Sequence, residues 1–302
     1  MKVLITGASG LLGSALRPLL ASEGRQVIRM GREASQLPDV ITWNPARREI
    51  DRSKFEGFAA VVHLAGENIA GSRWSDEAKS RIRNSRIEGT RFLSEELAKL
   101  KNKPEVLVCA SAVGFYGDRG DEPLTEESPP GIGFLAEVCQ EWEAAAQPAR
   151  DAGIRVVHFR FGMILSRKEG ALAKMLTPFK LGVGGIIGNG RQYWSWISVD
   201  DAAQLCRFAI ETKTLSGPVN AVAPEATTNA EFTKTLGRVL GRPTIFPVPA
   251  FAARLAFGEM ADALLLASAR VLPKVLESAQ FPYRHRTLEG ALRALLGKEQ
   301  AA

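Results

Sequence analysis

The segment Gly7-Ala-Ser-Gly-Leu-Leu-Gly13 constrains the fold of this chain more than any other feature. It directly follows an apolar, strand-like run at residues 3–5 and opens a helical pattern at residues 11–22. In such a unit the first glycine permits the sharp exit from the strand, the second lets the backbone approach a pyrophosphate, and the third lets the helix pack on the strand. The free N–H groups of the helix N-terminus favour an anion. The segment therefore predicts a dinucleotide site, and no Gly-Lys-Ser/Thr follows that would indicate a P-loop.

The same alternation of strand and helix continues through the first 160 residues. Further strands are expected at residues 26–30, 40–43, 60–64, 106–109 and 155–160, and further helices at residues 76–100 and 134–152. Strands that alternate with helices form parallel βαβ units with right-handed crossovers. The predicted fold class is α/β, a doubly wound parallel Rossmann sheet with a smaller, mostly helical C-terminal region.

The pattern becomes less regular beyond residue 162. Five glycines between Leu181 and Gly190 indicate a loop. The later elements are expected to be strands at 194–199 and 220–222, and helices at 200–212 (capped by Ser198), 229–240 (capped by Asn229), 251–272 and 288–296. We expect residues 1–163 to form the NADP-binding domain, with its sheet completed by about 191–222. Residues 164–190 and 223–302 are then the substrate-binding region.

Composition and charge exclude several classes of protein. Of the 302 residues, 45% are hydrophobic and 24% are charged, which is an ordinary globular balance. No apolar run approaches the ~18 residues of a membrane span, no signal peptide is recognised, and three cysteines give no disulfide framework. The net charge of +6 comes without a nucleic-acid-binding motif. We expect a cytoplasmic protein that binds neither membrane nor nucleic acid.

The end of the second strand decides which dinucleotide is expected. An NAD site normally has an Asp or Glu about 20 residues after the glycine loop, where it holds the ribose hydroxyls. Here Gly31 and Arg32 stand at that place, and no acid occurs before Glu33. A guanidinium pairs well with a 2′-phosphate, so the sequence favours NADP (NADPH) over NAD. The alternative for Arg32 is an ordinary surface charge.

Four motifs resemble the extended branch of the short-chain dehydrogenase/reductase superfamily. They are the glycine loop from Thr6 to Gly13, His63-Leu-Ala-Gly66 after the fourth strand, Arg86-Ile-Glu-Gly-Thr90 on a helix, and the segment from Ser111 to Gly117. The family's helix motif usually begins with Asn, which Arg86 replaces. Together with the glycine-loop reading, the resemblance implies cofactor contacts from Gly7, Ser9, Gly10, Leu11, Leu12, Gly13, Gly31, Arg32, Leu64, Ala65, Gly66, Glu67, Arg86 and Arg160.

Further segments narrow the resemblance to an atypical subgroup known as epimerase family proteins. These segments are Gly66-Glu-Asn-Ile69, Asn84-Ser-Arg86, Gln192-Tyr-Trp-Ser-Trp-Ile197 and Asn229-Ala-Glu-Phe232. Arg242-Pro243, Phe257-Gly258 and Arg270-Val-Leu-Pro273 resemble the uncharacterised domain that ends those proteins. The resemblance covers essentially the whole chain and implies an NAD(P)-dependent epimerase/dehydratase-like protein.

One departure from the family concerns catalysis. The superfamily's Tyr-x-x-x-Lys pair, a general acid–base arrangement, should open the helix after the fifth strand. This chain has Phe134 with Val138, or Leu135 with Cys139, in the two available registers. The family's usual mechanism therefore does not carry over to this sequence.

Other residues are candidates for the missing roles. Tyr116, near the carboxyl end of a central strand, is a candidate acid–base residue or else a pocket wall. Ser111 is a candidate to form a hydrogen bond with the substrate, or else its side chain forms a hydrogen bond with a backbone group. Substrate contacts are expected from Asn68, Arg191, Trp194 and Trp196, with core packing as the alternative for both tryptophans. Surface salt bridges are the alternative for Arg86 and Arg160. The three histidines are scattered, so no metal site is expected.

These observations leave two functional hypotheses. The first is an NADP-dependent oxidoreductase or epimerase that acts by hydride transfer on a small carbonyl or nucleotide-sugar-like substrate. The second is a non-catalytic NADP(H)-binding sensor or scaffold, which the absent Tyr and Lys favour. The substrate itself is not identified by the sequence, and a homodimer stays open.

Overall fold

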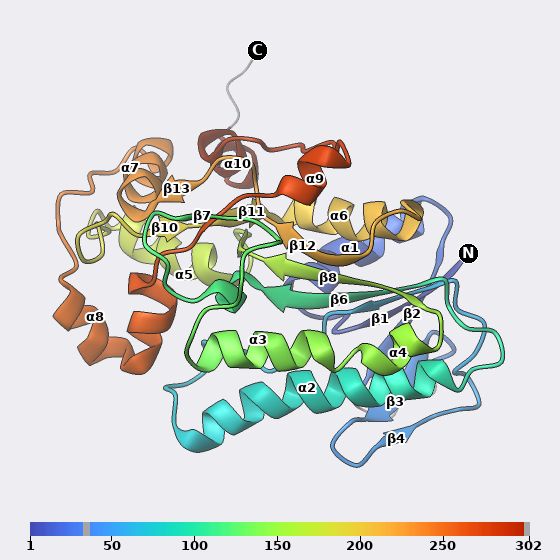
Figure 1. Cartoon of the computed structure of the whole chain (residues 1–302). Coiled ribbons are helices and arrows are strands. Elements are labelled where there is room, and N and C mark those ends of the chain that lie inside the picture. Colours follow the sequence, from blue (N-terminus) through green and yellow to red (C-terminus); the bar gives the residue numbers. More distant parts are fainter. Residues whose placement is uncertain (33–36, 299–302) are drawn as a thin grey trace. The chain divides into compact units, whose positions relative to one another are not determined.

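The computed structural model describes residues 1–32 and 37–298, and its contacts divide the chain into two compact units (Figure 1). The first unit comprises residues 1–111, 137–159 and 203–219. The second unit comprises residues 112–136, 160–202 and 220–302. Each unit has a hydrophobic core of its own.

The first unit is built on an eight-stranded sheet with the order β12-β8-β6-β5-β1-β2-β3-β4. Its strands are β1 (Lys2–Thr6), β2 (Gln26–Gly31), β3 (Val40–Asn44), β4 (Glu49–Ile50), β5 (Ala60–His63), β6 (Val106–Ala112), β8 (Arg155–Phe161) and β12 (Gly217–Ala221). Strands β6, β8 and β12 extend by a few residues into the second unit. The pairings among β1, β2, β3, β5 and β6 are parallel, whereas β4 is antiparallel to β3. The predicted α/β class with a largely parallel sheet is confirmed.

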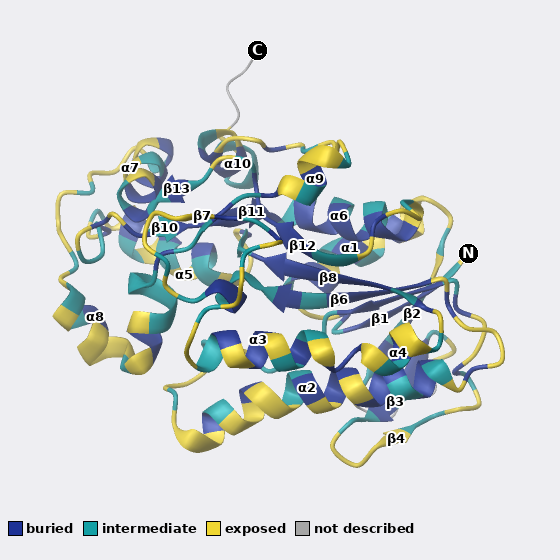
Figure 2. Cartoon of the chain, in the orientation of Figure 1, coloured by how far each residue is buried: buried dark blue, intermediate teal, exposed yellow. Residues whose placement is uncertain are grey.

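Helices cover both faces of this sheet. Helices α2 (Asp76–Ala98), α3 (Phe134–Ala144) and α4 (Gln147–Asp151) lie on one face, and α1 (Leu11–Ser22) and α6 (Val199–Glu211) lie on the other (Figure 1). The central strands are therefore buried, as Figure 2 shows, and Leu4, Val61 and Leu107 have no exposed surface. Because both faces of these strands are buried, their sequences are continuous apolar runs rather than alternations of apolar and polar residues.

The second unit is mostly helical. Its elements are η1 (Val113–Tyr116), β7 (Pro123–Leu124), β9 (Met163–Leu165), α5 (Gly170–Lys180), β10 (Tyr193–Trp194), β11 (Trp196–Ser198), β13 (Thr227–Thr228), α7 (Asn229–Leu240), α8 (Ala250–Phe257), η2 (Ala261–Leu266), β14 (Arg270–Val271), α9 (Lys274–Ser278) and α10 (Leu288–Leu295). Phe232 and Leu236 of α7 pack into the core of this unit, as their spacing predicts. The N-cap of α7 is Thr228 rather than Asn229, because Thr228 forms a reciprocal capping box with Glu231.

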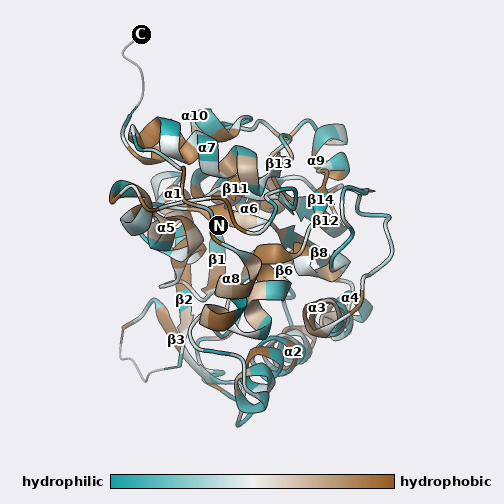
Figure 3. Cartoon of the chain, turned by 90° about the vertical axis from the view of Figure 1, so that its left-hand side faces the viewer, coloured by the Kyte–Doolittle hydropathy of each residue, from teal (hydrophilic) through white to brown (hydrophobic). Residues whose placement is uncertain are grey.

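Two predicted helices are interrupted in the structure. The helix expected at 134–152 is divided into α3 and α4, with Pro148 in the first turn of α4. The helix expected at 251–272 is wrong as a single element, because α8 ends at Phe257 and its C-cap, Gly258, has a φ of 63° that is not helical. A short π-helix, η2, and the strand β14 follow it. Phe251 of α8 is 72% exposed, and Figure 3 shows apolar segments along this helix.

No helix within the described residues is long and apolar enough to cross a membrane.

Candidate cofactor-binding site

The glycine loop between β1 and α1 is sterically closed to side chains at two positions. Gly7 has a φ of 65°, and a Cβ added to it would lie 2.8 Å from the carbonyl carbon of Leu64. A Cβ on Gly13 would collide with the carbonyl oxygen of Gly7 and lie 2.7 Å from the Cα of Ala8. The tight strand exit and the close helix–strand approach that the sequence predicts are therefore both present.

The N-terminus of α1 has free hydrogen-bond donors and no negative charge. Its N-cap, Gly10, makes no side-chain capping bond, and its first turn contains no acidic residue. Ser9 and Gly10 are exposed, Leu11 is half-buried, and Leu12 is buried. Unsatisfied N–H groups at the positive end of the helix dipole are suited to a phosphate, and here no side chain competes for them. These residues fit the pyrophosphate of a dinucleotide.

A buried chain of hydrogen bonds fixes the loop that follows β5. The Oγ1 of Thr6 accepts the N–H groups of Leu64 and Ala65, both at 3.1 Å. Because that oxygen already accepts two bonds, its own proton goes to Nδ1 of His63 at 2.7 Å. Nε2 of His63 then carries the ring proton and donates to Oγ1 of Thr90 at 3.0 Å. The Leu64–Ala65 backbone is thus held by groups from the neighbouring strand and from α2.

His63 is neutral in this arrangement. Burial lowers the pKa of His63 to about 4, so the ring carries no charge near neutral pH. The Oγ1 of Thr90 also accepts the indole N–H of Trp142 at 2.9 Å, which extends the chain to α3. His63 is a structural histidine, and the chain from Thr6 to Trp142 joins two strands and two helices behind the loop.

Gly31 and Arg32 lie at the end of β2. Gly31 is the last residue of the strand, and Arg32 is exposed directly after it. Arg32 forms no hydrogen bond or ion pair with any residue that the structure describes. An exposed guanidinium at this place is compatible with a phosphate, as the NADP prediction requires. Glu33 lies outside the described residues.

Arg86 reaches from α2 to the loop after β5. Its Nη1 donates to the carbonyl of Ile82 at 3.0 Å, and its Cζ lies 5.1 Å from the ring centroid of Trp142. A Cβ on Gly66 would lie 3.5 Å from the same Cζ. Burial lowers the pKa of Arg86, and the charge of Glu67 partly offsets this effect. Arg86 does not form the surface salt bridge that was its alternative role, because it has no ion pair with the described residues.

The next two residues of this loop have different roles. The N–H of Glu67 donates to Oγ of Ser85 at 3.0 Å, which ties the loop to α2. Asn68 is exposed, and its Oδ1 accepts the N–H of Ala70 at 2.9 Å. Neither side chain is sealed inside the protein, so both stay candidates for ligand contacts.

Ser111, near the end of β6, is buried. Its Oγ donates to Oε1 of Glu143 on α3 at 2.7 Å. The hydroxyl proton is therefore committed to a carboxylate within the protein. This geometry favours a structural role over a bond to substrate, and Glu143 is a partner that the sequence reasoning missed.

Tyr116, in the second unit, has no exposed surface. Its hydroxyl donates to Oδ1 of Asn220 at 2.7 Å and accepts from Nη1 of Arg160 at 3.0 Å. Burial raises the pKa of Tyr116, with Arg160 acting in the opposite direction. An enclosed phenol with both partners in place is unsuited to exchanging a proton with a ligand. The geometry does not support the acid–base role expected for it.

Arg160 belongs to the same buried cluster. It is 4% exposed, its Cζ lies 3.5 Å from the ring centroid of Phe115, and its Nη1 also approaches the carbonyl of Glu126 at 3.4 Å. These contacts within the second unit engage the guanidinium inside the protein and do not favour the expected cofactor contact. The guanidinium stabilises this cluster.

The substrate residues expected near the glycine-rich loop divide into two kinds. Trp194 and Trp196 are core residues of the second unit, and their indole N–H groups donate to the carbonyl of Leu265 and to Oγ1 of Thr227. The core-packing alternative therefore holds for both, and neither is offered to a substrate. Arg191 is exposed, so it stays a candidate.

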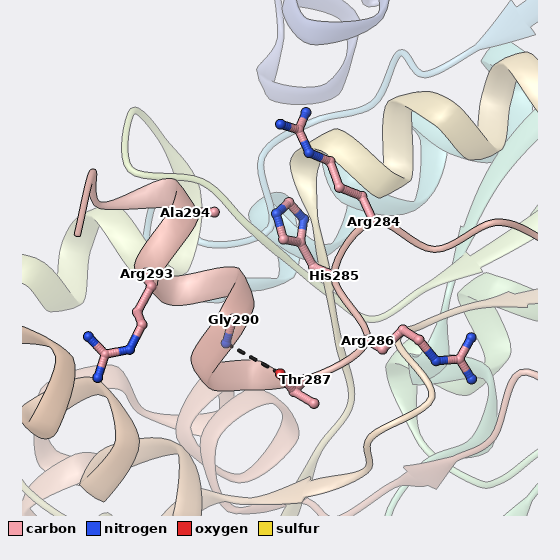
Figure 4. Close-up of a pocket in the computed structure, with 7 residues that line it drawn as sticks. All are labelled: Arg284, His285, Arg286, Thr287, Gly290, Arg293 and Ala294. Carbon is pink, nitrogen blue, oxygen red and sulfur yellow. Dashed lines mark hydrogen bonds between the residues drawn. The ribbon is translucent and has the colours of Figure 1, made fainter. Parts of the chain in front are cut away.

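A cavity of about 420 Å³ lies in the second unit, around the start of α10. Figure 4 shows the residues that line it. His285 lines it, and its Nδ1 lies 3.0 Å from Oγ of Ser198, which in turn donates to Asp201. Ser198 also accepts the N–H of Asp201, which confirms its predicted capping role. The three arginines that line the cavity point away from one another: Arg284, Arg286 and Arg293. They do not converge on one anion, and no metal-binding cluster occurs among the described residues.

The sequence profile of the NAD-dependent epimerase/dehydratase family matches residues 3–221. This chain belongs to that family. A profile described as a domain of unknown function matches residues 248–295, the C-terminal part of the second unit. An epimerase family protein of Mycobacterium leprae is 43% identical over 96% of this chain and 94% of its own length.

Solved structures agree with this assignment. The crystal structure of the human epimerase family protein SDR39U1 with NADPH superposes with a TM-score of 0.92 at 33% identity, covering 99% of this chain and 100% of the human one. UDP-N-acetylglucosamine 4-epimerase of Bacillus cereus has a TM-score of 0.76 at 18% identity, covering 99% of this chain and 100% of that one. The second likeness shows the shared fold alone.

Proposed function

We propose that this member of the epimerase/dehydratase family binds NADP(H) and is an oxidoreductase or epimerase that acts on a small carbonyl or nucleotide-sugar-like substrate. One observation carries the proposal. The N-terminus of α1 is uncapped and free of acid behind a glycine loop that excludes side chains. The NADPH in the human relative supports the same ligand for this chain.

The proposed contacts follow the geometry of the first unit. The pyrophosphate binds the N–H groups in the first turn of α1, and Arg32 binds the 2′-phosphate. The adenosine side lies along Leu64, Ala65 and Gly66. The bound nicotinamide supplies the hydride chemistry, while the protein binds, orients and excludes water. We assign the substrate region to residues 164–190 and 223–302. Asn68 in the first unit and Arg191 in the second unit are separate candidates for substrate contacts.

A second candidate is a non-catalytic NADP(H) sensor or scaffold. It is favoured because Tyr116 is enclosed and because α3 has Phe134 with Val138, or Leu135 with Cys139, where the family's acid–base pair would stand. A panel of carbonyl compounds with NADPH distinguishes the two candidates. Turnover that co-purifies with the protein supports the enzyme, whereas tight NADPH binding without turnover supports the sensor.

The cofactor preference is tested by titrating NADPH and NADH into wild-type protein, Arg32→Ala and Arg47→Ala. Arg47 is exposed and provides a control with the same loss of charge. Loss of a charge-assisted bond costs about 1.5–3 kcal/mol, so NADPH should bind at least about tenfold more weakly to Arg32→Ala. NADH affinity should not change, and Arg47→Ala should behave as wild type. Equal affinity of the wild type for both dinucleotides would contradict the NADP assignment.

A further inference from the structure

Arg86 is a half-buried cation that forms no ion pair with the described residues. One N–H of its guanidinium is used by the carbonyl of Ile82, a residue of its own helix. Burial lowers the pKa of Arg86, although Glu67 is near enough to favour its charged form. None of its nitrogens is among the buried polar atoms that lack a hydrogen-bond partner, so its remaining N–H groups are open to an anionic ligand.

The two surfaces against which this guanidinium lies are rigid. Gly66 follows the Leu64–Ala65 backbone that Thr6 holds, and Trp142 is held by Thr90. Thr6 and Thr90 are in turn joined through His63. One continuous chain of buried hydrogen bonds thus fixes the loop and the ring that enclose Arg86. A cation held in this way needs little reorganisation to bind a ligand.

We propose that Arg86 binds a carboxylate of the substrate, which makes the substrate class a small carboxylic acid with a carbonyl or hydroxyl group. A planar guanidinium matches a carboxylate through two parallel N–H···O bonds. The neighbouring Glu67 disfavours a phosphate dianion more strongly than a singly charged carboxylate. The pyrophosphate has its own donors at the N-terminus of α1, where no acid competes.

This inference rests on the proposed function, because it adds the substrate class to the same site. It also reassigns Arg86 from the cofactor to the substrate. A Cβ on Gly66 would make ordinary van der Waals contact with the guanidinium, at 3.5 Å from its Cζ, so a side chain longer than that of alanine would compete with Arg86 for this space. Helix α3 contributes the ring of Trp142 and the thiol of Cys139 beside Arg86. The only positive charge in these contacts is that of Arg86.

The test uses isothermal titration of the full chain with acetate, oxamate and malonate, each compared with its neutral amide, in the presence and absence of NADPH. We expect wild-type protein to bind at least one carboxylate tenfold or more tightly than the matching amide. Arg86→Met should remove that preference and change NADPH affinity less than twofold. Arg86→Lys should retain part of the preference, because it keeps the charge and loses the fork. Arg81→Met removes an exposed charge of the same helix and should behave as wild type.

Three results would overturn the proposal. The first is wild-type protein that binds acids and amides equally, with or without NADPH. The second is Arg86→Met that binds carboxylates as wild type does. The third is a tenfold loss of NADPH affinity in Arg86→Met with carboxylate binding retained, which would return Arg86 to the cofactor. Failure of wild-type protein to bind any dinucleotide refutes the proposed function instead, and the titrations without NADPH then still decide the carboxylate question. Circular dichroism of each variant confirms that it is folded.

Discussion

Replacing Gly13 with alanine should destabilise this protein although alanine is the better helix former. Gly13 lies in the first turn of α1, and the added Cβ would collide with the carbonyl oxygen of Gly7 and lie 2.7 Å from the Cα of Ala8. Both obstacles are backbone atoms, so no change of side-chain rotamer relieves them. The helix must move away from the strand that it packs against.

The magnitude follows from two opposing effects. Overpacking in a tight interior costs about 1–3 kcal/mol, and a collision with backbone belongs at the upper end of that range. Alanine in place of glycine returns about 1 kcal/mol in a helix interior, and less in a first turn. We therefore expect Gly13→Ala to lower the free energy of unfolding by about 2 kcal/mol. NADPH affinity should fall as well, because the N-terminus of α1 moves with the helix.

Substitutions at two other glycines should change either the stability of the protein or its affinity for NADPH, but not both. Gly89, inside α2, has only an atom of Trp43 at 3.9 Å from an added Cβ, so Gly89→Ala should raise stability by up to about 1 kcal/mol. Gly10 is exposed, and its added Cβ would lie 3.4 Å from the carbonyl oxygen of Gly7. Gly10→Ala should therefore change stability by less than about 0.5 kcal/mol. It should nevertheless weaken NADPH binding at least about tenfold, because the methyl group occupies the face that a pyrophosphate approaches.

Urea unfolding followed by circular dichroism, and NADPH titration of the same four proteins, measure both effects. The reasoning about helix–strand packing is refuted if Gly13→Ala unfolds at the same urea concentration as the wild type. The reasoning about the phosphate loop is refuted if Gly10→Ala binds NADPH with unchanged affinity.

Three further predictions concern buried or capping polar groups. Because burial lowers the pKa of His63 from 6.5 to about 4, its neutral form contributes stability above pH 6.5 that is lost as the pH falls toward 4. Urea unfolding at several pH values should show up to about 3 kcal/mol of this loss, and a flatter profile in His63→Gln. Tyr116→Phe should lower the free energy of unfolding by about 1–3 kcal/mol, because it removes the hydroxyl that bonds Oδ1 of Asn220 and Nη1 of Arg160, while NADPH-dependent turnover of any identified substrate persists. A loss of turnover in a folded variant would restore the acid–base role. Thr228→Ala should lower the melting temperature in a thermal scan, with a cost of about 1 kcal/mol, because it removes the cap of α7.

Those parts of the fold that depend on local pattern could be predicted from the sequence. Helix α1 has the expected bounds, Leu11–Ser22, because a glycine loop defines its start and an apolar stripe defines its length. The central strands were predictable because burial on both faces leaves continuous apolar runs. The stretch at 251–272 was not predictable in the same way. Its apolar composition resembles one helix, but the positive φ of Gly258 ends α8 early, and a single glycine inside an apolar run does not reveal its φ.

The candidate site was predictable only where backbone performs the function. Gly7 and Gly13 are required by contacts with neighbouring backbone, and such contacts leave a signature in the sequence because no other residue fits. The Thr6–His63 pair left a weaker signal, namely polar residues that end two apolar strands. Since parallel neighbours end at the same edge of a sheet, that pair could have been found from the strand assignment.

Polar side chains near the end of β6 show why catalytic roles could not be predicted. Ser111 and Tyr116 both have groups that take part in proton transfer, and both lie where α/β sheets place ligands. Their chemistry is nevertheless decided by partners distant in sequence: Glu143 accepts the hydrogen bond of the Ser111 hydroxyl, and Asn220 accepts that of the Tyr116 hydroxyl. Arg86 is the opposite case, since the sequence left it open between a cofactor contact and a surface salt bridge. Its enclosure against Gly66 and Trp142 without a protein counter-charge is what makes it a ligand-binding residue. Whether a polar side chain near the candidate site binds a ligand or stabilises the protein therefore depends on which of its hydrogen bonds are already made within the fold.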